Sequence, residues 1–189
     1  VTVEEVLDVA GVRTGDVDVV MAGIPCEGYS LLNRRYDPSD PRNYLFMEFL
    51  RHVKKLKPKA VLIENVLGLL RRENGGFRKL IEDALENLGF KARSFTLNAA
   101  DFGVPQRRVR VFFIGLSSSE RFEPPHPTHD ALGSLSRIVD SAKPYVTVWD
   151  AISDLPPLQA GEEKHRYESE PKTEYQKLMR EGSNRVHNH

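Results

Sequence analysis

The sequence predicts an α/β fold with a largely parallel sheet, and three observations support it. Residues 17–23 and 60–66 form short apolar runs of the kind found in strands buried in a parallel sheet. A helical pattern follows each run, and this strand-helix alternation is typical of α/β proteins. Residues 91–97 and 109–114 are two further strands, which we expect to pair as an antiparallel hairpin at one edge of the sheet.

The predicted helices have recognisable starts and ends. Residues 40–57 form an amphipathic helix that opens on an N-cap aspartate and a first-turn proline and ends where a Lys-Pro pair stops the apolar pattern. Residues 77–88 form a second helix, which Gly89 closes. Shorter helices are predicted within residues 147–155 and 171–182, the latter in a polar context typical of a connector.

Composition excludes several classes of protein. The 189 residues contain 27 Lys and Arg and 27 Asp and Glu, so any polyanion site must be local. No apolar stretch approaches the ~20 residues of a membrane-spanning helix, and no signal peptide opens the chain. The single cysteine, Cys26, excludes internal disulfides and multi-cysteine zinc sites and fits a reducing compartment. A cytoplasmic protein is therefore predicted.

Two polar segments are expected at the carboxyl-terminal edge of the sheet, where open parallel sheets bind ligands. Gly23-Ile24-Pro25-Cys26 follows the first strand, and Glu64-Asn65-Val66 ends the second. If these strands are neighbours, their ends lie roughly 4.8 Å apart, and both Cys26 and Glu64 reach one small ligand. Pro25 restricts the loop and favours a thiol held outside the sheet.

A cluster of cations enters the last strand at Gln106-Arg107-Arg108-Val109-Arg110. Strand alternation predicts Arg108 and Arg110 on one face and Arg107 and Val109 on the other. Two converging guanidinium groups would lower the thiol pKa from its free value of about 8.5, hold a carbonyl oxygen, or neutralise a phosphate.

These three segments, in this order, resemble the DNA cytosine carbon-5 methyltransferase family. The segment at Cys26, together with Ser30, resembles the nucleophile loop of that family; Glu64-Asn65-Val66 resembles its Glu-Asn-Val triplet; and the arginine cluster resembles its Gln-x-Arg-x-Arg element. The resemblance runs from about Val1 to Pro157, with a fainter match at the C-terminus. Connecting segments also match: Tyr44-Leu45-Phe46, Lys57-Pro58, Ala100-Asp101-Phe102-Gly103-Val104-Pro105, Pro127-Thr128-His129 and Asn188-His189.

The resemblance implies a partial Rossmann-like fold of the class I S-adenosylmethionine-dependent methyltransferases, and a reaction. Cys26 would add to carbon 6 of a cytosine flipped out of double-stranded DNA, so that carbon 5 accepts the methyl group of S-adenosylmethionine. Glu64 would hold or protonate ring nitrogen 3 and contact the exocyclic amine. Arg110, supported by Arg108, would bind the cytosine carbonyl.

The resemblance also implies binding residues. Pro25 and Leu45 match positions of the cofactor pocket, while Ser30, Gln106 and Arg107 match DNA-binding positions. No metal is predicted, because His126 and His129 lie in a proline-rich loop without a third ligand.

The sequence departs from the family pattern within the motifs and at both ends. Glu27 and Tyr29 stand where the family usually has glutamine and phenylalanine. The Phe-x-Gly-x-Gly cofactor loop and three strands should precede Val1, and the target-recognition domain, a final helix and an Asn-x-Val element should follow His189. We therefore expect the isolated chain to be inactive and poorly soluble, and expect a complementary chain as a second partner besides DNA.

The expected organisation has three parts. Residues 1–116 form a partial catalytic domain, residues 117–157 continue it as a loop and a short helix, and residues 158–189 connect it to the recognition domain.

Two alternative functions remain open at this point. Glu27 and the missing cofactor loop also fit a catalytically inactive relative that binds DNA or a protein partner. A cysteine hydrolase would instead pair Cys26 with His126 or His129.

Overall fold

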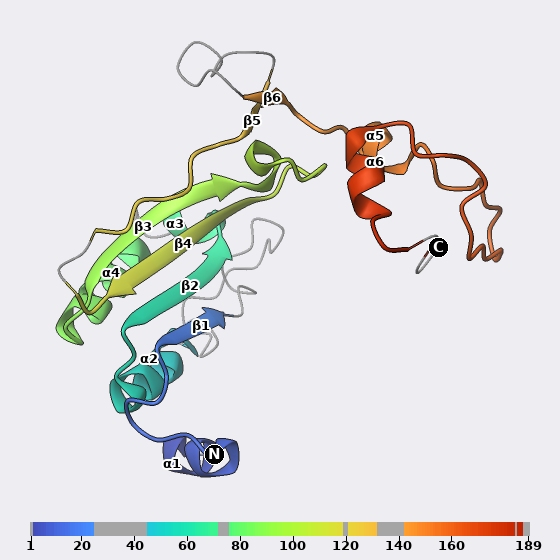
Figure 1. Cartoon of the computed structure of the whole chain (residues 1–189). Helices are drawn as coiled ribbons and strands as arrows, with labels where there is room; N and C mark the ends of the chain where they lie inside the picture. The colour runs from blue at the N-terminus through green and yellow to red at the C-terminus, as the bar shows by residue number, and fades with distance from the viewer. Residues whose placement is uncertain are drawn as a thin grey trace. The chain divides into compact units, whose positions relative to one another are not determined.

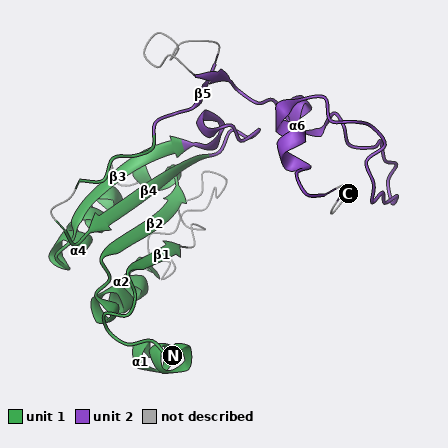
Figure 2. Cartoon of the chain, in the orientation of Figure 1, with its two compact units in different colours: residues 1–97, 109–125 green, residues 98–108, 126–189 purple. Residues whose placement is uncertain are grey.

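The chain folds into two compact units (Figure 2). Unit 1 comprises residues 1–97 and 109–125, and unit 2 comprises residues 98–108 and 126–189. This division follows contacts within the fold and does not test the three expected domains, which stay a prediction. The computed structural model describes residues 2–24, 45–71, 76–118, 121–131, 142–183 and 185–186.

Unit 1 is built on a four-stranded mixed sheet. Its strands, in spatial order, are β1 (Val19–Gly23), β2 (Ala60–Val66), β4 (Val109–Leu116) and β3 (Lys91–Asn98). β1 and β2 are parallel, β4 runs antiparallel to β2, and the arrows of β3 and β4 point in opposite directions (Figure 1). The predicted α/β fold with an antiparallel hairpin at one edge is confirmed.

Two helices of unit 1 pack against the same face of the sheet. α2 (Leu45–Leu56) and α4 (Gly76–Asn87) confirm the two predicted amphipathic helices, although the predicted start of the first, at residues 40–41, lies outside the described residues. Their buried side chains form one apolar core with β2 and β4, which places the other side chains of both strands on the opposite face. The core contains Phe46, Leu50, Val53, Val61, Ile63, Phe77, Ile81, Leu85, Val111 and Phe113.

The end of α2 shows how a local sequence signal sets a helix boundary. Pro58 disfavours a helical conformation at the preceding residue, and Lys57 indeed leaves the helix with a φ of 51°. Lys57 is the only residue other than glycine with positive φ in the described part of the chain. The predicted end of the helix at Lys57-Pro58 is thus confirmed. Lys57 adopts a left-handed backbone conformation there.

Two short helices of unit 1 were not predicted from the sequence. α1 (Val3–Ala10) begins with a capping box, in which Thr2 Oγ1 accepts a hydrogen bond from Glu5 N and the Glu5 carboxylate accepts one from Thr2 N. α3 (Gly68–Arg71) follows β2 directly.

The first strand, β1, lies at an edge of the sheet although its sequence is apolar on both faces. Its apolar sequence predicts a strand covered on both faces, but Val19 is 53% exposed and Met21 is 69% exposed. The physical reason is position: β1 is the edge strand of the sheet, and among the described residues no strand pairs with its outer side. An apolar sequence indicates a strand that can be buried on both faces, but it does not show which other strands and helices cover it.

Unit 2 has little regular structure. It contains the 3₁₀ helix η3 (Ala99–Phe102), the two-residue parallel strands β5 (His129–Asp130) and β6 (Lys143–Pro144), and two short helices. α5 (Val148–Ile152) and α6 (Glu174–Met179) lie within the segments in which short helices were predicted, and each opens on a capping box.

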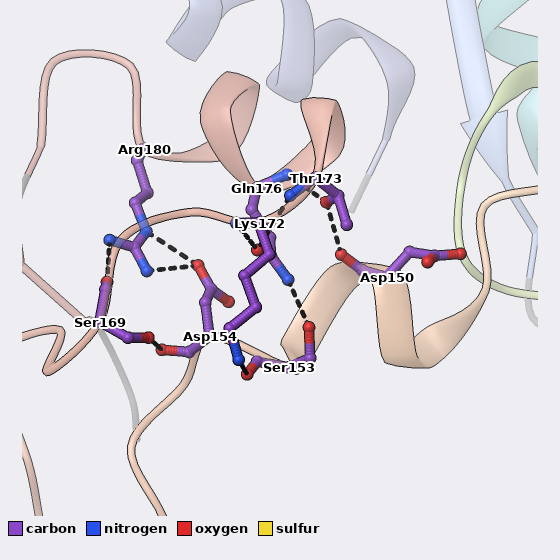
Figure 3. Close-up of polar contacts among 8 residues, drawn as sticks. All are labelled: Asp150, Ser153, Asp154, Ser169, Lys172, Thr173, Gln176 and Arg180. Carbon is purple, nitrogen blue, oxygen red and sulfur yellow. Dashed lines mark hydrogen bonds and ion pairs between the residues drawn. The ribbon is translucent and has the colours of Figure 1, made fainter.

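A network of polar side chains joins the segments around α5 and α6 (Figure 3). Asp154, 3% exposed, accepts hydrogen bonds from Arg180 Nε and Nη2 at 2.8 and 2.6 Å. The Arg180 guanidinium also lies 3.6 Å from the centre of the Tyr167 ring. Gln176, 1% exposed, donates to Ser153 Oγ at 2.8 Å and accepts from Lys172 N at 2.6 Å. Oriented polar contacts therefore hold this part of unit 2 together.

We expect Asp154→Ala to destabilise unit 2 by up to about 3 kcal/mol, because it leaves the Arg180 guanidinium, 11% exposed, without its buried carboxylate partner. Urea unfolding followed by the fluorescence of Trp149, the one tryptophan of the chain, measures this change in the α5 segment. The matched control is Glu174→Gln, which breaks the surface pair with Lys177 and leaves the unfolding midpoint unchanged. Equal midpoints for Asp154→Ala and the unchanged protein would show that the buried pair does not stabilise the unit.

Candidate active site

The carboxylate of Glu64 lies at the carboxyl-terminal end of β2. Alternation along the strand buries Val61, Ile63 and Asn65 in the core and turns Glu64 to the opposite face. In the register with β4, Glu64 is opposite Phe112 and Val66 is opposite Arg110. Glu64 and Arg110 are therefore diagonal neighbours on one face of the sheet, within reach of long side chains.

Glu64 and Arg110 form an ion pair. Arg110 Nε lies 2.9 Å from Glu64 Oε1, and the side chains are 23% exposed for Arg110 and 35% for Glu64. Arg110 Nη1 also donates to its neighbour's carbonyl, Val109 O, at 2.9 Å, which orients the guanidinium plane. A partly exposed pair of this kind adds little to stability. Its chemical use is that an acceptor and a set of donors stand side by side, complementary to a planar ligand that presents N–H and carbonyl groups on one edge.

The end of β1 lies next to this pair. Gly23 is opposite Glu64 in the sheet register, and a Cβ placed on Gly23 would lie 4.0 Å from Glu64 Oε2. The chain therefore passes Glu64 immediately before the segment that contains Cys26. Pro25, Cys26 and Ser30 themselves lie outside the described residues, so their predicted roles stay predictions.

Asn65 is a site residue that the sequence analysis did not assign. Its side chain is 3% exposed, and its Nδ2 donates to the carbonyl of Ile24 at 3.4 Å, while its Oδ1 accepts from Val66 N at 2.8 Å. The asparagine thereby ties the end of β2 to the residue that precedes Pro25. The available signal was a polar residue on the buried side of an otherwise apolar strand.

The remaining predicted site residues occupy different settings. Leu45 is the first residue of α2 and is 37% exposed. Gln106, Arg107 and Arg108 are exposed. They precede β4, which begins only at Val109, so the alternation predicted over residues 107–110 is wrong for its first two arginines. The reason is that Arg108 belongs to the end of a connecting segment, where its carbonyl accepts a hydrogen bond from Ala99 N at 2.9 Å.

The segment that leads to Gln106 requires a glycine. Gly103 has a φ of 83°, and a Cβ at this position would lie 2.6 Å from Cε1 of the His129 ring. Both the backbone conformation and the close imidazole exclude a larger residue. The matched segment Ala100–Pro105 is thus held in a tight turn against β5.

The part of the chain that the structure describes lacks two kinds of feature. It contains no group of three or more His, Cys, Asp or Glu side chains arranged to hold a metal ion. None of its helices is both long and apolar enough to span a membrane.

Comparison with known proteins gives a consistent result. The family model for C-5 cytosine-specific DNA methylase matches residues 4–189. Type II methyltransferase M.AgeI of Thalassovita gelatinovora is 41% identical over 95% of this chain and 45% of its own length. Type II methyltransferase M.DdeI of Desulfomicrobium norvegicum is also 41% identical, over 94% of this chain and 42% of its own length.

A solved structure supports the fold. The crystal structure named as a prophage-encoded DNA modification methyltransferase (E. coli) superposes with a TM-score of 0.60 at 26% identity, covering 90% of this chain and 43% of that one. The chain thus spans less than half the length of these relatives.

Proposed function

Because this chain belongs to the C-5 cytosine-specific DNA methylase family, we propose that the enzyme containing it transfers a methyl group to carbon 5 of a cytosine flipped out of duplex DNA. The observation that carries this proposal is the Glu64–Arg110 pair, which lies beside the point where β1 leads into the segment of Cys26. A carboxyl group and a guanidinium side by side match the nitrogen 3, amine and carbonyl groups along one edge of cytosine.

The proposed chemistry begins at Cys26. Carbon 5 of cytosine is a poor nucleophile until the aromatic ring is interrupted, and addition of the Cys26 thiolate to carbon 6 produces an enamine. Glu64 holds nitrogen 3 and the exocyclic amine and delivers a proton to the ring as the thiolate adds. Arg110 donates to the carbonyl oxygen, on which negative charge develops, with Arg108 as the supporting cation. After methylation a base removes the proton of carbon 5, and the Cys26 thiolate leaves as the double bond reforms.

S-adenosylmethionine, when bound, supplies the methyl group as an electrophile. The observation that bears on this cofactor is Leu45, an apolar side chain that is 37% exposed at the start of α2. Exposed apolar surface at a helix start fits contact with a cofactor, and we assign Leu45, together with Pro25, to its pocket.

The proposed DNA contacts come from Ser30, Gln106 and Arg107, of which the latter two are exposed in the structure. The open edge of β1 is where we place a further strand, supplied by the same polypeptide or by a complementary chain. We further propose a role in restriction-modification, as for type II methyltransferases, and a cytoplasmic location, because a catalytic thiol has to stay reduced.

The test of the function is the identity of the product. The full-length enzyme, incubated with double-stranded DNA and S-adenosylmethionine labelled in the methyl group, is expected to yield labelled 5-methyldeoxycytidine on digestion to nucleosides and mass spectrometry. A label on an exocyclic nitrogen, or DNA without label at saturating cofactor, would reject the assignment. DNA without label would favour the alternative of a catalytically inactive relative, which no observation on the described residues supports.

A further inference from the structure

Unit 2 contains an open pocket whose lining includes two of the proposed DNA contacts, Gln106 and Arg107, together with Tyr145, which has no role assigned so far. Its volume is about 530 Å³, within the range of about 300–1,000 Å³ that is usual for small-ligand sites. Its lining includes the apolar residues Pro105, Val146 and Val148, the aromatic residue Tyr145, and the polar residues Gln106 and Arg107. The pocket therefore combines an aromatic surface, a hydrogen-bonding amide and a cation.

Tyr145 is held by one hydrogen bond from its hydroxyl and one from its backbone N. Its hydroxyl donates to Asp101 Oδ1 at 2.7 Å, and its backbone N donates to Asp130 O at 3.1 Å. Asn98 Nδ2 donates to the same Asp101 oxygen at 3.2 Å and so fixes the carboxylate. The hydrogen bond to Asp101 raises the pKa of Tyr145, so the phenol keeps its proton and its hydrogen bond at neutral pH. A ring fixed in this way loses little entropy when a flat ligand stacks on it.

The cation of the pocket is Arg107. Arg107 is exposed, forms no ion pair with another described residue, and lies close enough to Tyr145 to oppose the effect of Asp101 on the pKa of the phenol. Arg107 pairs with none of the nearby carboxylates among the described residues: Asp101 accepts from Tyr145, Asp150 accepts from Thr147 N at 2.8 Å in the capping box of α5, and Asp130 also acts on the Tyr145 phenol. Guanidinium groups pair well with phosphate oxygens, while an amide such as that of Gln106 offers both a donor and an acceptor to a base edge.

We propose that this pocket is a DNA subsite that binds one nucleotide of the substrate strand, with its base stacked on Tyr145, its base edge on Gln106 and its phosphate on Arg107. The proposal rests on the proposed function and adds to it, because Tyr145 is assigned a contact with DNA and Asp101 becomes a positioning residue. The chemical class of ligand follows from the pocket: a planar base needs the ring, and its phosphate needs the cation.

The first arm of the test compares two substitutions of one side chain in the full-length enzyme. Tyr145→Leu removes the ring and is expected to weaken DNA binding about tenfold, as for loss of one stacked base. Tyr145→Phe keeps the ring, loses only the hydrogen bond to Asp101, and is expected to change the Kd by less than about threefold. Fluorescence anisotropy of a labelled oligonucleotide measures both. Equal weakening by the two variants would overturn the stacking role.

The second arm measures salt dependence. Arg107→Gln is expected to reduce the slope of log K against log salt by about 1, as for the loss of one phosphate contact on duplex DNA. The matched control is Arg185→Gln, which removes the same charge from an exposed position of unit 2 outside the pocket and leaves the slope unchanged. Because Arg107 is exposed, its substitution does not depend on how well the Tyr145 variants fold. An unchanged slope for Arg107→Gln would overturn the phosphate contact.

The outcome for the subsite separates from that for the function. One outcome is that the unchanged enzyme forms 5-methylcytosine while the Tyr145→Leu variant binds DNA as tightly as the unchanged enzyme. In that case the proposed subsite is wrong and the proposed function stands. If the unchanged enzyme binds DNA through Tyr145 and Arg107 but forms no 5-methylcytosine, the subsite stands and the proposed reaction is wrong.

Discussion

Replacement of Cys26 by alanine is expected to reduce kcat/KM for methyl transfer by about 10⁴-fold or more, since the covalent route depends on this one sulfur. The thiolate has no substitute in the chain, because Cys26 is its only cysteine. Binding of DNA should survive, because phosphate contacts supply much of the affinity. The measurement is steady-state methyl transfer to duplex DNA, with the Kd for the same duplex determined in parallel.

A mechanism-based inhibitor tests directly whether Cys26 is the covalent nucleophile. In a duplex that carries 5-fluorocytosine at the target, fluorine replaces the proton that a base has to remove, so the thiol is not expelled. The enzyme and the DNA are then expected to stay joined through Cys26 under denaturing electrophoresis. Ordinary cytosine at the same position gives no such complex and serves as the control. A covalent complex that still forms with Cys26→Ala would assign the nucleophile to another residue.

The second large effect is expected at Glu64. Glu64→Gln keeps the size of the side chain but removes the carboxyl group that delivers a proton, and kcat is expected to fall by about 10²–10⁴-fold. The substitution also leaves Arg110 without the carboxylate that lies 2.9 Å away. Single-turnover methyl transfer, with enzyme in excess over DNA, measures the chemical step.

Two comparisons show whether this loss is specific. Glu48→Gln breaks an exposed pair with Arg51 on α2 and should leave the rate unchanged. Combined with Arg110→Ala, Glu64→Gln should cost less than the product of the two single effects, because both residues act on one base. A rate for Glu64→Gln equal to that of the unchanged enzyme would remove Glu64 from the catalytic set.

Local pattern predicted the sheet and the strands on which Glu64 and Arg110 lie. The period of β2 places Glu64 outside the core, and the apolar pattern of β4 fixes where Arg110 lies in its strand. The register between two antiparallel strands then brings the two charges together. The face of its strand on which each residue lies could be predicted, because it depends on residues close together in the sequence. The contact between Glu64 and Arg110, which are far apart in the sequence, depends on the strand register.

Other features could not be predicted in this way. The Asp154–Arg180 pair joins residues 26 positions apart, and the Tyr145–Asp101 hydrogen bond joins residues 44 positions apart. No period connects such residues, so only the folded chain shows the contact. Helix α1 was also not predicted, although the signal for it was in the sequence: Thr2 and Glu5 have the spacing of a capping box.

The contrast between the interiors of the two units has a thermodynamic consequence. In the described part of unit 2 the buried apolar residues are Ala100, Pro156 and Val186, and the buried polar ones are Asp130, Asp154 and Gln176. Exposure of apolar surface raises the heat capacity on unfolding, whereas exposure of polar surface lowers it. Unit 2 should therefore unfold with a small heat-capacity increment for its length. Its stability curve is broad and flat with temperature, while that of unit 1 is more sharply curved.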